Sequence, residues 1–81
     1  MNYNIFLTGQ IVLFPYNFTP VGFFKCNGQT LQVQDHITLY SLIGNKYGGD
    51  ETFFLLPDFT SAAPQGCAYF IAYQGFYPER K

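Results

Sequence analysis

The dipeptide Asn27-Gly28 separates two short runs that both favour β-structure. Asn-Gly readily supplies the two positive φ angles of a type I′ turn, whose twist suits a hairpin with a two-residue loop. In the second run, Leu31 and Val33 alternate with polar residues, which gives that run one face for a core. The sequence therefore predicts a tight antiparallel hairpin, with Phe23–Cys26 leading into the turn and Gln29–Val33 leaving it.

Three further segments have the character of strands. Gly9–Phe14 ends at Pro15, Phe53–Leu56 ends at Pro57, and Ala68–Tyr73 is apolar on both faces. Proline ends a strand because it has no N–H to donate to the ladder. We expect the last strand to leave an open sheet edge.

A single helix is predicted over residues 35–43. The Asp35 carboxylate is placed to accept hydrogen bonds from the free amides of the first turn. Ile37, Leu39, Tyr40, Leu42 and Ile43 form an apolar stripe, and Gly44 suits the left-handed conformation that ends a helix. Strands outnumber this helix in a chain of 81 residues, so the fold class is a small single α+β domain with short antiparallel strands, a hairpin and one main helix.

Composition removes several classes of function. Ten Phe and seven Tyr with only 11% charged residues argue against disorder. Four basic residues and a net charge of −1 leave no electrostatic footprint for nucleic acid. The longest apolar run, residues 68–73, is too short to span a membrane. No positive charge precedes Ile5, so we expect no signal peptide and synthesis in the cytoplasm.

The glycine-rich segment 44–58 is either a ligand loop or a turn that feeds a strand. No Gly-Lys-Ser/Thr follows its glycines, as a phosphate loop requires, and its acidic residues lack the alternation of a calcium loop. We therefore expect Tyr47-Gly48-Gly49-Asp50 to shape a turn and to hold no ion.

Cys26 and His36, with Asp35 or Asp58 to orient the histidine, are candidates for a nucleophile and its base. Activated thiols occur at helix N-termini or beside cations, whereas Cys26 precedes a turn on a predicted strand. Adding Cys67 gives too few soft ligands for zinc. We predict no enzymatic activity, no metal and no cofactor, and two buried free thiols, with an internal disulfide as the alternative.

The ordered set of short motifs resembles the phage tail collar domain, which occurs in short tail fibres and in microcystin-dependent protein-like proteins. The residues that carry the resemblance are Gly9-Gln10-Ile11, Cys26-Asn27-Gly28-Gln29, Leu42-Ile43-Gly44, Tyr47-Gly48-Gly49-Asp50 and Leu56-Pro57-Asp58, with Tyr69–Pro78 similar to the family's closing stretch. The resemblance implies one collar-like domain over residues 1–81. Its parts would be a collar motif at 9–59, a connecting loop at 60–66 and a closing strand at 67–78.

The chain departs from that family in one large respect. Family members carry a long middle region before the closing strand, with a receptor-binding head in the fibres, and here only a short loop stands in its place. What the resemblance implies is therefore a structural and docking unit. The residues expected to build it are Asn27, Gly28, Gln29, Asp35, Gly44, Tyr47, Gly48, Gly49, Asp50, Pro57 and Asp58.

The resemblance also indicates assembly. We expect a non-enzymatic part of a phage tail or of a phage-derived injection machine, in a virion tail or extracellular particle, that binds other tail, fibre or baseplate proteins. So aromatic a chain should self-associate, and the fibres of this family are trimers. The expected contact residues are Phe53, Phe54, Tyr69, Tyr73, Phe76 and Tyr77. The alternatives are a stand-alone module for surface glycans or receptors and a self-assembling extracellular filament subunit.

Overall fold

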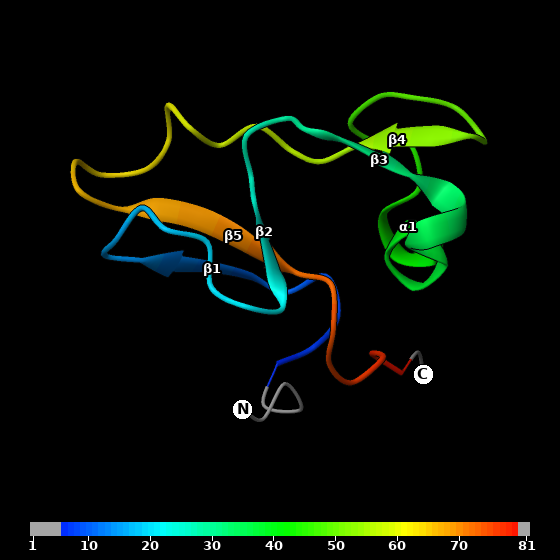
Figure 1. Cartoon of the computed structure of the whole chain (residues 1–81), viewed down its shortest axis with the longest axis horizontal. Helices are drawn as coiled ribbons and strands as arrows, with labels where there is room; N and C mark the ends of the chain where they lie inside the picture. Colours follow the sequence, from blue (N-terminus) through cyan, green and yellow to red (C-terminus); the bar gives the residue numbers. More distant parts are fainter. Residues whose placement is uncertain (1–5, 80–81) are drawn as a thin grey trace.

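A computed structural model of the chain describes residues 6–79. In chain order these residues form β1 (Ile11–Phe14), β2 (Phe23–Lys25), β3 (Thr30–Gln32), a 3-10 helix (Val33–Asp35), α1 (Ile37–Ile43), β4 (Phe53–Leu55) and β5 (Ala68–Ala72) (Figure 1). All strand pairs are antiparallel and fall into two sheets beside the one α-helix. The expected α+β class is confirmed. Within residues 6–79, no helix has both the length and the apolar character needed to cross a membrane.

The larger sheet is built around the last strand. Its order is β1-β5-β2, with Ile11 opposite Ile71 on one side and Phe24 opposite Ile71 on the other. The expectation that residues 68–73 leave an open edge is therefore wrong. A central strand is covered on both faces, which explains why this segment is apolar throughout.

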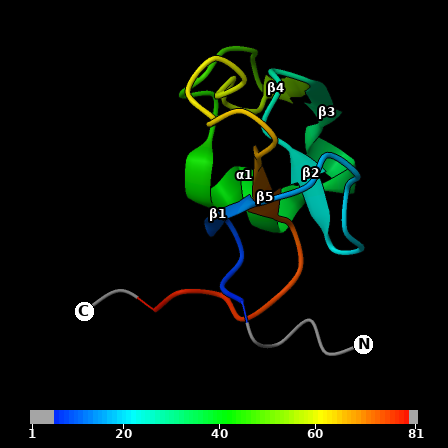
Figure 2. The same ribbon diagram turned by 90° about the vertical axis from the view of Figure 1, so that its left-hand side faces the viewer.

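The smaller sheet pairs β3 with β4, so that Leu31 lies opposite Phe54. It lies beside α1, whereas β1, β2 and β5 form the other part of the molecule (Figure 1). The first and last described segments meet at one end, where Leu7 and Phe76 form a parallel bridge (Figure 2).

The predicted hairpin at Asn27-Gly28 is absent, because the strands that flank it belong to different sheets. Gly28 has φ +79°, but no residue other than glycine has positive φ in the described part of the chain, so Asn27 does not supply the second angle of a type I′ turn. The N–H of Asn27 instead donates to Lys25 O at 2.9 Å, and that of Gly28 donates to Pro57 O at 3.2 Å. The dipeptide carries the chain from one sheet to the other.

The helix begins later than predicted. Asp35 ends the 3-10 helix, and His36 stands at the N-cap without a side-chain capping bond, so the expected Asp35 cap is wrong. The cause is the tighter turn, closed by the His36 N–H on Val33 O at 3.0 Å, which places Asp35 before the first turn of α1. At the other end, Gly44 has φ +55° and its N–H donates to Tyr40 O. Leu39 is buried, whereas Ile37 is 64% exposed and lies outside the apolar stripe.

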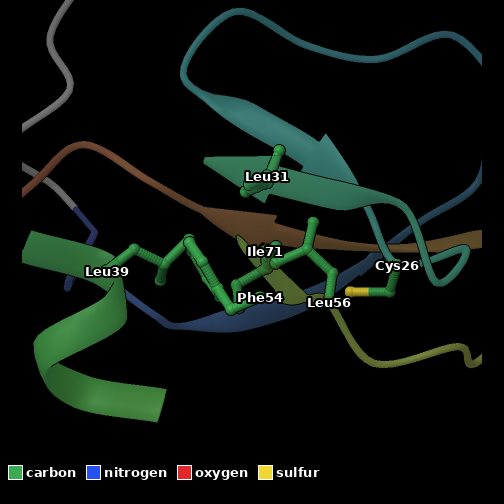
Figure 3. Packing of buried hydrophobic residues seen from close by; sticks show 6 residues of the cluster. All are labelled: Cys26, Leu31, Leu39, Phe54, Leu56 and Ile71. Carbon is green, nitrogen blue, oxygen red and sulfur yellow. The ribbon is translucent and has the colours of Figure 1, made fainter. Parts of the chain in front are cut away.

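Two clusters of apolar side chains lie on opposite faces of the larger sheet. The first joins both sheets to the helix and consists of Cys26, Leu31, Leu39, Phe54, Leu56 and Ile71 (Figure 3). The second consists of Phe23, Ala68, Phe70 and Ala72. Successive side chains of β5 alternate between the two clusters, as the pleat of a strand requires.

Candidate functional site

The turn before β4 is built by the Asp50 carboxylate. It accepts the N–H groups of Thr52 at 2.8 Å and Phe53 at 3.1 Å. These bonds, that from Phe53 above all and then that from Thr52, hold the pKa of Asp50 below its ordinary value. Gly48 and Gly49 both have positive φ, and a Cβ on Gly49 would overlap the carbonyl of Phe53. The Asp50 carboxylate in this turn therefore points toward the backbone of the turn itself.

A second carboxylate, that of Asp58, also stabilises a turn by accepting hydrogen bonds from residues just after β4. Asp58 accepts the Thr60 hydroxyl at 2.7 Å and the Thr60 N–H at 3.2 Å, and these bonds, the hydroxyl's first, lower its pKa. Asn27 forms an antiparallel bridge with Asp58.

The two best-defined sequence motifs meet at this bridge. The Leu56 N–H donates to Gln29 O at 3.0 Å, and the Phe59 N–H donates to Cys26 O at 2.9 Å. The side-chain amide of Gln29 donates to Lys25 O at 3.0 Å. The Cys26–Gln29 and Leu56–Asp58 motifs are thus the two sides of one backbone contact, with Pro57 buried within it.

The structure does not assemble the candidate thiol chemistry. Cys26 is 1% exposed in the first apolar cluster, and burial raises its pKa to about 11. The His36 ring packs against Phe24 at 5.1 Å and Tyr73 at 5.8 Å. Cys67 is half-buried rather than buried, and both thiols are free. In the described part of the chain, no three His, Cys, Asp or Glu side chains gather as a metal site.

The aromatic residues expected at an interface divide into three groups. Phe53, Phe76 and Tyr77 are exposed, and the Tyr77 hydroxyl lies 2.8 Å from the Ser41 hydroxyl on α1. Tyr69 and Tyr73 are half-buried against the first cluster. Phe54 has no exposed surface, so its assignment to an interface is wrong. It is the inward member of β4, between the two exposed or half-exposed neighbours Phe53 and Leu55.

Two apolar features near β1 were missed from the sequence. Ile11 and Leu13 are 37% and 41% exposed, and Ile11 lines a hollow of about 300 Å³ with Phe59, Ala62 and Tyr69. From the last residue of β1 onward, Phe14, Tyr16 and Phe18 stack face to face, and Phe18 ends the stack 66% exposed. The signal available in the sequence was the uncharged run Ile11–Phe14 followed by alternating aromatic residues.

Comparison with known proteins identifies the family to which this fold belongs. The family model of the phage tail collar domain matches residues 9–64, well over half of the chain. The search of curated proteins found no match to the chain. The collar domain is a structural rather than an enzymatic unit related to phage tail fibres, and it implies a phage tail component that associates with other tail proteins. The chain belongs to the phage tail collar domain family.

Proposed function

We propose that this chain is a non-enzymatic docking part of a phage tail or of a phage-derived tail-like injection machine, placed at the collar, at a fibre attachment point or at the tip. The observation that carries the proposal is the family match over residues 9–64. The contacts of the motif residues support it, because Gly28, Gly49, Asp50 and Asp58 are engaged with the chain's own backbone and side chains. Such residues hold a shape, and a docking part needs a fixed shape.

Self-association is the second element of the proposal. Large apolar side chains that remain exposed on so weakly charged a surface are typical of interfaces. They are Leu7, Ile11, Leu13, Phe18, Val21, Ile37, Tyr47, Phe53, Phe76 and Tyr77. We propose a homo-oligomer, with the three-fold symmetry of the fibres that the chain resembles, and with Phe53, Tyr69, Tyr73, Phe76 and Tyr77 near its contacts.

The location is tested on assembled particles. A tagged chain is expressed together with the remaining tail genes, and intact particles are purified and labelled with gold against the tag. Label at the collar, the fibre bases or the tip is expected. Particles that assemble fully and carry no label would overturn the assignment to the tail.

Self-association is tested on the isolated chain by sedimentation equilibrium. An oligomer is expected, with a mass that is a multiple of 9.3 kDa. A monomer at every concentration, without binding of a dye that reports exposed aromatic surface, would remove this element and leave the location intact.

A second candidate function is the binding of a surface glycan or receptor. The exposed ring of Phe18 ends the aromatic stack, and beside it Lys25 donates to the Asn17 side chain at 2.7 Å. An aromatic face next to polar groups is a common way to hold a sugar ring. Binding of the isolated chain to a glycan array, lost in Phe18→Ala, would favour this function over docking.

A further inference from the structure

The outer edges of the two sheets differ in how they are protected. Beyond β4, the N–H of Leu55 donates to Gly48 O at 3.2 Å and the N–H of Asp50 donates to Phe53 O at 2.7 Å. Beyond β2, the N–H of Phe23 donates to Pro20 O, and Lys25 O accepts the N–H of Asn27. At both of these edges the chain itself engages part of the outward backbone groups, and β2 also carries the charge of Lys25.

The outer edge of β1 has no such cover. The N–H of Ala72 donates to Gln10 O at 3.0 Å, so by the alternation of an antiparallel ladder Val12 and Phe14 turn their backbone groups toward β5. The N–H and C=O groups of Ile11 and Leu13 then point outward. No hydrogen bond within residues 6–79 engages them. An uncharged, apolar edge with free backbone groups is a ready template for another strand.

The outer edge of β3 is also open, but it is polar. The N–H of Leu56 donates to Gln29 O and that of Val33 to Thr52 O, which turns the backbone groups of Thr30 and Gln32 outward. Both residues are exposed and hydrophilic, so water satisfies this edge. β1 is therefore the one open edge in the described part of the chain that is also apolar.

We propose that the β1 edge pairs with the β1 edge of a second copy about a two-fold axis. This inference rests on the self-association proposed above and places one of the contacts between copies at the β1 edge. With outward groups on Ile11 and Leu13, an antiparallel pair centred on Val12 sets Ile11 of each copy opposite Leu13 of the other. All of the outward N–H and C=O groups of these residues are then bonded. Paired residues share a face of the sheet, so the four apolar side chains also meet, next to the two hollows.

The charge of the β1 edge and the area that it can bury both indicate what kind of partner it would pair with. The edge and the hollow carry no charged residue, so two copies meet there without burying a charge. A stable dimer buries roughly 800 Å² per partner, against a total surface of 5345 Å² here. A four-residue edge is only about 13 Å long, so the contact is weak in solution and strengthens when copies are held together on a particle. A two-fold contact closes at two copies, and joining it to three-fold association about a perpendicular axis gives six copies.

A disulfide tests the register. Val12 faces itself across the axis at a pair without hydrogen bonds, where Cα atoms lie about 4.5 Å apart, which a disulfide can span. In a Cys67→Ser background, Val12→Cys should form a linked dimer on mild oxidation. Gln32→Cys, on the open polar edge, is the matched control and should link only at the rate of random collision. Equal rates for the two variants would overturn the proposed pairing.

Sedimentation separates this contact from self-association in general. Leu13→Lys should abolish the two-fold contact, whereas Thr30→Lys adds the same charge to the polar edge and should not. Circular dichroism checks that both variants fold. Leu13→Lys oligomers of the same mass as those of the wild type would leave self-association standing and overturn the β1 contact, whereas a fall to the three-fold oligomer or to monomers would support it. Wild-type monomers at every concentration, with no preferential Val12→Cys linkage, would overturn both. Protection of the Leu13 amide from hydrogen exchange only on intact particles, without preferential linkage, would overturn the second copy in favour of a strand from another tail protein.

Discussion

Asp50 and Phe53 bond to each other in both directions. The Asp50 N–H donates to the Phe53 carbonyl at 2.7 Å, and the Asp50 carboxylate accepts the Phe53 N–H at 3.1 Å. This double contact closes the turn and sets the start of β4, which in turn holds Phe54 in the core. The segment Tyr47–Asp50 thus has a backbone task that can be tested separately from any ligand.

The close approach at Gly49 should be sensitive to a single methyl group. Gly49 has φ +101° and no room for a Cβ, whereas Gly66 has φ +82° with nothing within 4 Å. Gly66→Ala should cost about 1–2 kcal/mol from backbone strain alone, and Gly49→Ala about 3 kcal/mol or more because overlap adds to strain. Urea unfolding measures both free energies. Equal losses would mean that the close approach of Gly49 to Phe53 does not constrain the turn.

The Asp50 carboxylate should make the fold sensitive to acid. Its pKa in the folded chain lies below the ordinary 3.8, so its ionised form favours folding. This contribution is fully present above pH 3.8 and is lost as the pH falls through the folded pKa. Asp50→Ala should therefore show a smaller drop in urea midpoint between pH 7 and about pH 3 than the wild-type protein. Glu51→Ala, which removes the adjacent charge, serves as the control, and an identical drop in the Asp50 variant would contradict this role.

The same loop should be indifferent to calcium. Because Asp50 bonds Thr52 and Phe53, we expect Asp50→Asn and the wild-type protein to melt at temperatures that do not change with added calcium or with chelator. Differential scanning calorimetry makes the comparison. A calcium-dependent rise in the wild-type melting temperature that Asp50→Asn removes would establish an ion site.

Cys26 should react slowly with iodoacetamide. With a pKa of about 11, only about one thiol in 10⁴ is ionised at neutral pH, and the sulfur is buried as well. Cys67 is half-buried and should be alkylated first. Trypsin separates the two cysteines onto different peptides, so mass spectrometry follows each rate. Fast alkylation of Cys26 in the folded protein would restore the thiol nucleophile as a hypothesis.

Local patterns in the sequence predicted the elements better than their partners. The positions of β1 and β4 follow from apolar runs that end at proline, the position of β5 follows from the uninterrupted apolar run 68–73, and Gly44 ends α1 as expected. The hairpin predicted at Asn27-Gly28 was wrong because a turn preference acts over two residues, whereas strand pairing is decided by the packing of the whole core. Leu31 lies opposite Phe54 across β3 and β4, and both side chains are buried in the first cluster. The preference of the dipeptide for a hairpin gives way to tertiary packing.

The candidate interface was only partly predictable. Aromatic content indicated exposed rings, and Phe53, Phe76 and Tyr77 are exposed. Composition does not say which face of a strand is inward, and Phe54 was therefore assigned to the interface together with its exposed neighbour Phe53. The apolar edge at Ile11 and Leu13 depends on β5 being central, and that topology links segments too far apart for local patterns to reveal.

The central place of β5 also sets when this protein can fold. Ile11 pairs with Ile71, sixty positions further along the chain, and among the strands of residues 6–79 β2 pairs only with β5. On a ribosome, which makes the N-terminal side first, β1 and β2 must wait unpaired until residue 72 has emerged. Closing so long a loop is slow, and uncovered apolar strands are prone to aggregate meanwhile. The residues matched to the collar family end at 64, so a chain truncated there would lack the strand that joins its own sheet.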